Sequence, residues 1–242
     1  MPPTIEILGQ GPITIESALN EEKNLINWAS YGPATNNLYQ EIWEQRDSVA
    51  ALVKHHMALR RQDKCIVLPP HNWIRGSFNV CIFVEVNSSG VRRKVVFRCP
   101  LPHKLAEARY PGSIDEKSSC EAGAYVWVEE NCPEIRSLHL FGFGFMDGRH
   151  FTHSKYAPFF SRTWRQLWRF IYKFFRLPLL SHYVWNPPRH QVRSAYMVLE
   201  YLGHETGQPL SDTFDTYREN GTQRQRLFRG ISRILLSLAR IP

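Results

Sequence analysis

A short loop that contains a glycine, followed by a strand that carries an arginine, could together hold a phosphate group. The loop residues are Gly76, Ser77, Phe78 and Asn79. A glycine at such a turn lets backbone N–H groups approach an anion closely. Val96 and Arg98 are two residues apart on the following strand, so their side chains share one face of the sheet. The loop and the arginine could therefore contact the same anion.

Two strands and a helix must position these residues. Residues 80–86 are rich in β-branched and aromatic side chains, residues 87–90 read Asn-Ser-Ser-Gly, and residues 94–99 resume an alternating pattern. This pattern predicts a β-hairpin. A helix that ends at Asn131 follows, and its Glu121 could reach Arg98. We expect Ser113 or Asp115 to cap that helix, and its buried stripe to be Cys120, Ala124, Tyr125 and Val128.

Composition limits the class of protein. The 242 residues are 43% hydrophobic, which suffices for a substantial core, and the net charge of +8 favours phosphate-bearing partners without choosing among them. Five cysteines without CxxC spacing argue against a complete disulfide framework and predict a reducing, cytoplasmic location. The N-terminus lacks a secretory pattern, and no run of about 18 apolar residues predicts a transmembrane segment.

The remaining segments predict further helices and strands. Residues 1–20 read as a loosely held arm, and residues 36–61 read as a packing helix capped by Asn36 or Asn37. Strands are expected at 135–145, at 150–152 directly after an Asp-Gly turn, and at 194–202. C-terminal helices with an apolar inner stripe are expected to follow the last strand. His150 and His153 suggest a metal, but no third ligand has suitable spacing, so we predict no metal site.

Residues 159–176 form a basic and aromatic segment without an acid. Helical spacing gathers five cations on one face, namely Arg162, Arg165, Arg169, Lys173 and Arg176. Aromatic and aliphatic side chains fill the rest of the circumference. Such a helix could lie on an anionic membrane or follow the phosphate backbone of RNA. The interpretation favoured by the pattern alone is an inserted helix whose aromatic face packs on its own protein.

The order of these parts resembles the small lobe of protein kinase-like phosphotransferases, and more closely the fungal branch of the aminoglycoside phosphotransferase and choline-kinase-like family. The segments that carry the resemblance are WIRGSFNVCIFVEV, VVFRCPLPHKLAE, PGSIDEKSSCEAGAYVWVEENCPEI, LFGFGFMDGRHFTH, YMVLEYL and RLFRGISRILLSLARIP. The resemblance implies an α+β fold, with an antiparallel sheet of about five strands and an αC-type helix. It also implies a helical N-terminal extension in residues 1–65, a lobe in 66–202 with an insertion at 154–193, and a hinge exit in 203–242.

The resemblance also implies roles in binding ATP with Mg²⁺. The loop from Gly76 to Asn79 would cover the phosphates, and Arg98 would take the place of the strand lysine. Glu121 would orient Arg98, and Val96 would form the floor beneath the adenine. The hinge would run from Glu200 to Leu202, where backbone groups read the adenine edge.

The sequence departs from the family in the residues that perform catalysis. Phosphoryl transfer needs an Asp that orients the attacking hydroxyl, and an Asn and a second Asp that bind the metal. We expect none of these three residues here. Asp215 and Asn220 match D-x-x-x-x-N only by spacing, without the surrounding motif. The resemblance thus implies a truncated lobe, inactive alone, that binds nucleotide weakly and needs its missing C-lobe or another chain. The alternative is a non-catalytic module that binds a membrane or RNA.

Overall fold

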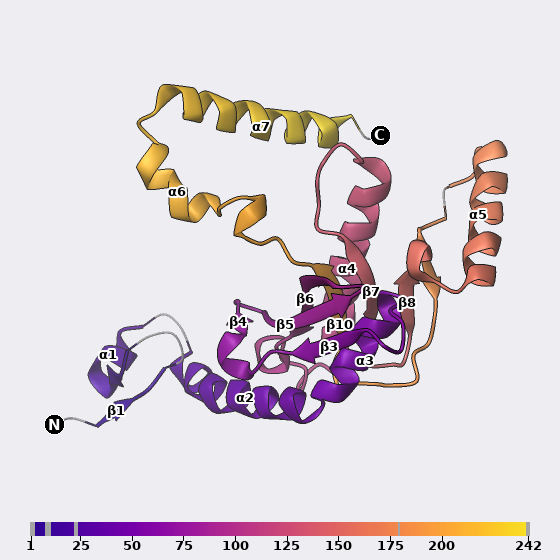
Figure 1. Cartoon of the computed structure of the whole chain (residues 1–242). Coiled ribbons are helices and arrows are strands. Elements are labelled where there is room, and N and C mark those ends of the chain that lie inside the picture. Colours follow the sequence, from indigo (N-terminus) through magenta and orange to yellow (C-terminus); the bar gives the residue numbers. More distant parts are fainter. Residues whose placement is uncertain (1–2, 8–10, 22–23, 179, 241–242) are drawn as a thin grey trace.

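The protein is an α+β chain built on an antiparallel sheet, and the computed structural model describes residues 3–7, 11–21, 24–178 and 180–240 (Figure 1). Within these residues an 8-stranded sheet has the order β3-β5-β6-β10-β7-β8-β9, with β4 paired to β5. Its strands are β3 (Lys64–Val67), β4 (Ile74–Arg75), β5 (Asn79–Ser88), β6 (Val91–Pro100), β7 (Leu140–Gly144), β8 (His150–His153), β9 (Tyr183–Trp185) and β10 (Tyr196–Glu200).

The predicted hairpin is present as β5 and β6. Ser88 pairs with Val91, and the two turn residues Ser89 and Gly90 have positive φ angles of 51° and 78°. Two successive positive φ values give a turn whose twist matches that of the strands it joins. The side chains of β5 alternate, and its four fully buried residues are Val80, Ile82, Val84 and Val86. The other face of β5 and β6 is half exposed, and it carries Arg98.

Two helices cover the face of the sheet that those valines occupy, α2 (Leu25–Glu44) and α3 (Arg46–His56). The prediction of a packing helix over 36–61 was right in its buried side, but the helical region begins earlier, at Leu25, is interrupted at Gln45 and ends at His56. Asn24 caps α2 by accepting a hydrogen bond from the Asn27 N–H at 3.2 Å, and the helix continues through Pro33. After the proline, Leu38 and Ile42 are buried against the sheet, and before it Lys104 lies over the ring of Tyr31 at 3.6 Å, so packing overrides the local signal that a proline ends a helix.

The helix α4 (Ser113–Asn131) packs on the opposite face of the sheet, where Ala122 joins Phe143, Met197 and Leu199 in a second core cluster. The predicted stripe was partly wrong: Cys120 and Ala124 are exposed, whereas Tyr125 packs against this cluster and Val128 is half buried. The buried residues of α4 are Ile114, Ser118 and Ala122. The apolar residues of α4 are spread around its circumference, so their spacing alone did not identify the inner face.

A carboxylate from the preceding loop caps α4, in place of the predicted Ser113 or Asp115. Glu107 accepts hydrogen bonds from the N–H groups of Gly112 at 2.7 Å and Ile114 at 2.8 Å, and from the Ser113 hydroxyl at 2.8 Å. Partial burial acts to raise the pKa of Glu107, but these hydrogen bonds outweigh it and hold the pKa below its usual value. The acid therefore stays charged at the positive end of the helix.

Removing this cap should weaken the fold. We expect Glu107→Ala to lower the free energy of unfolding by about 1 to 2 kcal/mol, because two helical N–H groups lose their acceptor. Urea unfolding at neutral pH measures the change. Glu116 is an exposed acid in the same first turn, so Glu116→Ala is the matched control. It should lower the free energy of unfolding by only about 0.3 kcal/mol. Equal losses in the two variants would contradict the assignment of the cap.

The arm and the C-terminal helices lie away from the large sheet (Figure 1). The arm contains β1 (Thr4–Ile5), β2 (Ile13–Thr14) and α1 (Ile15–Leu19), and the C-terminal part contains α6 (Leu210–Tyr217) and α7 (Gly221–Ala239). The last helix is confirmed. Of its five expected inner residues, Leu227 is half buried, and Ile231, Ile234, Leu235 and Leu238 are exposed. In the part of the chain that the structure describes, no helix combines the length and apolarity needed to span a bilayer.

The described residues of the predicted insertion form a short 3-10 helix (Ser154–Tyr156), one α-helix and one strand. The helix α5 (Phe159–Phe174) follows β8, and β9 then pairs with β8 at the edge of the sheet. The segment is therefore continuous with the sheet through β9, and α5 stands outside it (Figure 1).

Candidate functional site

Four polar side chains meet on the half-exposed face of the sheet, and we call them the Arg98–Glu121 cluster. Arg98 Nη2 lies 3.3 Å from Glu121 Oε1, and Lys117 Nζ lies 2.5 Å from the same oxygen. Asn79 Nδ2 donates to Glu121 Oε1 at 3.3 Å, and Lys117 Nζ donates to Asn79 Oδ1 at 3.0 Å. The predicted pair of Arg98 and Glu121 is present, and it links strand β6 to helix α4.

Local structure explains why these residues converge. Arg98 faces away from the α2 and α3 core because its neighbours Phe97 and Cys99 occupy that side of β6. Lys117 and Glu121 are four residues apart on α4, which places them on the same face of the helix. Asn79 begins β5, and its side chain fills the space between the two elements. Sequence reasoning missed Lys117, although its spacing from Glu121 was a usable signal.

The cluster carries two cations and one anion, so its net charge is positive. The side chains of Arg98, Lys117 and Glu121 are 25%, 17% and 26% exposed, which limits screening by water. Glu121 Oε2 is buried, and it makes no hydrogen bond within the described residues. Cys81 pairs with Arg98 across the hairpin, and burial raises the pKa of its thiol, opposed by Arg98 and assisted by Glu121. The net positive charge of the Arg98–Glu121 cluster favours an anionic ligand.

The loop before β5 differs from the expected phosphate-covering loop. The Gly76 N–H donates to Asn79 O at 2.8 Å, so the turn itself uses that amide. A Cβ at Gly76 would lie 3.6 Å from Asn79 O, an ordinary contact, and φ there is not positive. The turn therefore does not require glycine, and Ser77 and Phe78 are exposed at its tip. Of the four loop residues, Asn79 is the one that joins the cluster.

The remaining predicted residues lie along the same strands. Val96 is half buried, pairs with Phe83 and packs against the second core cluster. Glu200 pairs with Val95, three residues from Arg98 and so about 10 Å along β6. Its carboxylate accepts from the His139 N–H at 3.2 Å and lies 3.6 Å from Arg136. Leu202 follows β10 and is 45% exposed. The expected hinge is thus at the far end of the strands from the cluster.

A hollow of about 390 Å³ lies beside this end. It is lined by Glu85, Arg92, Arg93, Lys94, Tyr201, Gly203 and Glu205. Tyr201 packs edge-on against Phe83 at 5.4 Å between ring centroids, and Lys94 lies over its ring at 5.9 Å. Sequence reasoning did not include the three successive cations, which the run Arg-Arg-Lys at the start of β6 could have suggested.

Two histidines that could have suggested a metal have separate partners. His150 Nδ1 lies 3.0 Å from the Tyr196 hydroxyl, whereas His153 Nε2 lies 3.1 Å from Glu129 Oε1. In the part of the chain that the structure covers, no group of three or more His, Cys, Asp or Glu side chains could hold a metal ion. The same Tyr196 hydroxyl also lies 2.9 Å from His56 Nε2, so a buried polar layer joins α3 to the sheet.

The residues spaced like a catalytic loop belong to two helices. Asp215 lies on α6, and Asn220 caps α7 by accepting from the N–H groups of Thr222 at 3.1 Å and Gln223 at 3.2 Å. The side-chain Oδ1 of Asn220 therefore accepts hydrogen bonds from the backbone of α7, and this capping role accounts for an asparagine at this position.

Comparison with protein-family models, with curated proteins and with solved structures finds no match for this chain.

Proposed function

We propose that the Arg98–Glu121 cluster binds the phosphates of a nucleotide, in the manner of the small lobe of a kinase-like phosphotransferase. The observation that carries the proposal is the 3.3 Å ion pair between a strand cation and a helix glutamate. In protein kinases the corresponding pair, with a lysine on the strand, must be in place for phosphoryl transfer. Arg98 is a planar fork that can hold Glu121 with one edge and phosphate oxygens with the other.

The arrangement around the cluster supports the same proposal. Along the chain, the elements run in the order hairpin, helix with a glutamate, strand pair and central strand, as in the phosphotransferases that the sequence resembles. Helix α4 covers only part of its face of the sheet, so Val96 and Arg98 are half exposed on one side of β6. An adenine above Val96 would point toward Glu200 and Leu202, and its phosphates would reach Arg98.

The reaction class that this arrangement would serve is transfer of a phosphoryl group from Mg-ATP to a small-molecule hydroxyl. The cluster would hold and orient the phosphates, and Lys117 would add a second cation near them. A base and metal ligands would have to come from a second lobe or from another chain. We therefore expect binding without turnover from the described residues alone.

Titration with Mg-ATP, followed by calorimetry or by a fluorescent nucleotide, tests the proposal. Removing a charged donor costs about 1.5 to 3 kcal/mol, so Arg98→Ala should weaken binding by about tenfold or more. Arg98→Lys should lose less, because the charge remains. Arg189→Ala removes the same charge from an exposed loop and is the matched control. The proposal is wrong if Arg98→Ala, still folded by circular dichroism, binds Mg-ATP as tightly as the parent.

A further inference from the structure

Helix α5 presents its apolar face to solvent, opposite to the orientation expected from the sequence. The large exposed side chains of this segment are Phe159, Phe160, Trp164, Leu167, Trp168, Phe170, Phe174 and Phe175. Phe170 and Phe174 are 69% and 73% exposed. At about 100° per residue, these side chains cover roughly half of the helix circumference. An uncovered apolar surface of this extent on one helix marks an interaction site.

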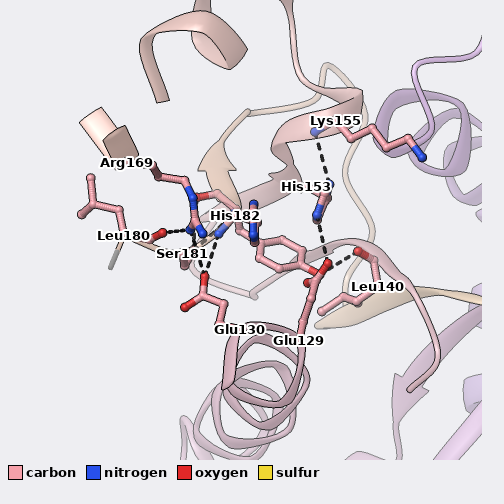
Figure 2. A network of polar contacts seen from close by, with 10 residues as sticks. Glu129, Glu130, Leu140, His153, Lys155, Arg169, Leu180, Ser181 and His182 are labelled. Carbon is pink, nitrogen blue, oxygen red and sulfur yellow. Dashed lines mark hydrogen bonds and ion pairs between the residues drawn. The ribbon is translucent and has the colours of Figure 1, made fainter. Parts of the chain in front are cut away.

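The cationic face of α5 holds the helix to the protein (Figure 2). Arg169 Nη1 lies 3.2 Å from Glu130 Oε1 on α4 and also donates to the Leu180 carbonyl oxygen. Arg165 Nε donates to the Ser181 carbonyl oxygen at 2.8 Å. Glu130 in turn accepts from the His182 N–H at 3.0 Å. The side chains of Arg169 and Glu130 are only 19% and 14% exposed, so this is a partly buried ion pair.

These contacts fix the orientation of the helix. Turning the aromatic face inward would separate Arg169 from Glu130 and leave a buried carboxylate without its partner, which is costly. Arg165 and Arg169 are also no longer available to a phosphate backbone, since backbone carbonyls and Glu130 occupy them. The two central arginines of the predicted RNA contact are therefore structural, and the accessible surface is aromatic.

The chemistry of the exposed surface fits a lipid bilayer. A helix that packs in a protein groove needs a narrower apolar stripe of about 100°, whereas an interfacial helix buries a wide apolar face. The segment 159–176 has five cations and no acid, which complements anionic headgroups. Lys173 and Arg176 are exposed and free of the contacts that hold Arg165 and Arg169. Trp168 and Tyr172, which contact each other, are ring types that favour the membrane interface.

We propose that α5 binds an anionic membrane in the plane of its interface. The aromatic face enters the boundary between headgroups and acyl chains, and Lys173 and Arg176 reach lipid phosphates. Arg165 and Arg169 stay on the protein side, where Arg165 binds the Ser181 carbonyl oxygen and Arg169 joins the helix to α4. This interaction does not depend on nucleotide binding by the Arg98–Glu121 cluster.

Flotation of the whole chain with lipid vesicles tests this proposal. We expect binding to phosphatidylcholine vesicles that contain about 30% phosphatidylserine, weaker binding to phosphatidylcholine alone, and some retention above about 0.5 M salt because of apolar insertion. Phe170→Gln with Phe174→Gln should weaken binding by at least about tenfold. Ile66→Gln, on β3 at the opposite edge of the sheet, removes an exposed apolar side chain from outside the proposed surface and should leave binding unchanged.

Quenching by lipids brominated on their acyl chains tests the depth and the face that inserts. The parent should be quenched, and Trp164→Phe with Trp168→Phe should lose most of the quenching when equal amounts of vesicle-bound protein are compared. Absence of vesicle binding, or equal binding by the Phe170 and Phe174 variant, would overturn the proposal. Vesicle binding that high salt abolishes, and that gives no quenching, would also overturn the proposal. Self-association or RNA binding that depends on these phenylalanines, without vesicle binding, would assign the surface to that partner instead.

Discussion

Gly142→Ala should destabilise the fold by about 3 kcal/mol or more, because the strand β7 has no space for a methyl group at this position. A Cβ there would lie 2.2 Å from His56 Nδ1 and 2.7 Å from the Phe151 carbonyl oxygen. His56 is fully buried, and its Nδ1 lies 2.8 Å from the Thr152 hydroxyl. Any shift of the imidazole that relieves the clash would therefore break a buried hydrogen bond, and the backbone carbonyl cannot move independently of β8.

The measurement is urea unfolding of Gly142→Ala beside a glycine that has space. Gly123 lies within α4, and a Cβ there would meet nothing within 4 Å. Gly123→Ala should therefore stabilise the protein by about 0.5 to 1 kcal/mol through helix propensity alone. Neither glycine has a positive φ, so the comparison isolates the contact with His56 from backbone strain. A Gly142→Ala protein as stable as the parent would show that His56 does not occupy this space.

Stability should fall steeply as the pH drops below about 6.5, the ordinary histidine pKa. Burial, then the charges of His55 and His150, lower the pKa of His56, and burial is also the main cause of the lowered pKa of His150. Below pH 6.5 the unfolded chain binds protons that the folded chain does not, so acid favours unfolding. Each pH unit costs up to about 1.4 kcal/mol for a group that stays neutral in the fold. We expect the fully buried His56 to contribute most of this loss between pH 7 and 5.

Urea midpoints measured from pH 7.5 to 5 give the slope. His56→Gln keeps polar atoms near Thr152 and Tyr196 but removes one titrating group, so its stability should depend less on pH in this window. The comparison concerns the slope alone, since the variant also changes packing. A parent protein whose unfolding free energy is constant from pH 7 to 5 would contradict a neutral, buried His56.

The sequence predicted the parts that depend on neighbours along the chain. Alternation in β5 and β6 and the residues of the turn are local signals, and they gave the hairpin. The Arg98–Glu121 pair also followed from local rules, the two-residue repeat of a strand and a glutamate on the helix after it. Side chains that meet through tertiary packing, such as Lys117 with Asn79, were missed because their register depends on how α4 docks.

The orientation of α5 shows a different limit of sequence reasoning. Helical spacing correctly grouped the cations apart from the aromatic residues, but spacing cannot say which face turns inward. That choice was made by Glu130, 39 residues before Arg169, and by carbonyl oxygens after the helix. In the same way, the sequence predicted the strand that contains the glycines of β7, but it did not predict that His56 and His150 occupy the space beside them. The start of α2 was missed because Pro33 is a strong local signal against a helix.

The central position of β10 affects how the chain can fold. The strands β5 with β6, and β7 with β8 and β9, can pair soon after they are made, because each pair is close in sequence. Strand β10 pairs with both β6 and β7, and residues 101–195 separate it from the first of them. Closing so long a loop is slow, and until it closes both half-sheets have an open edge. During synthesis, residue 200 must therefore leave the ribosome before these edges are sealed, and until then they can pair with other chains.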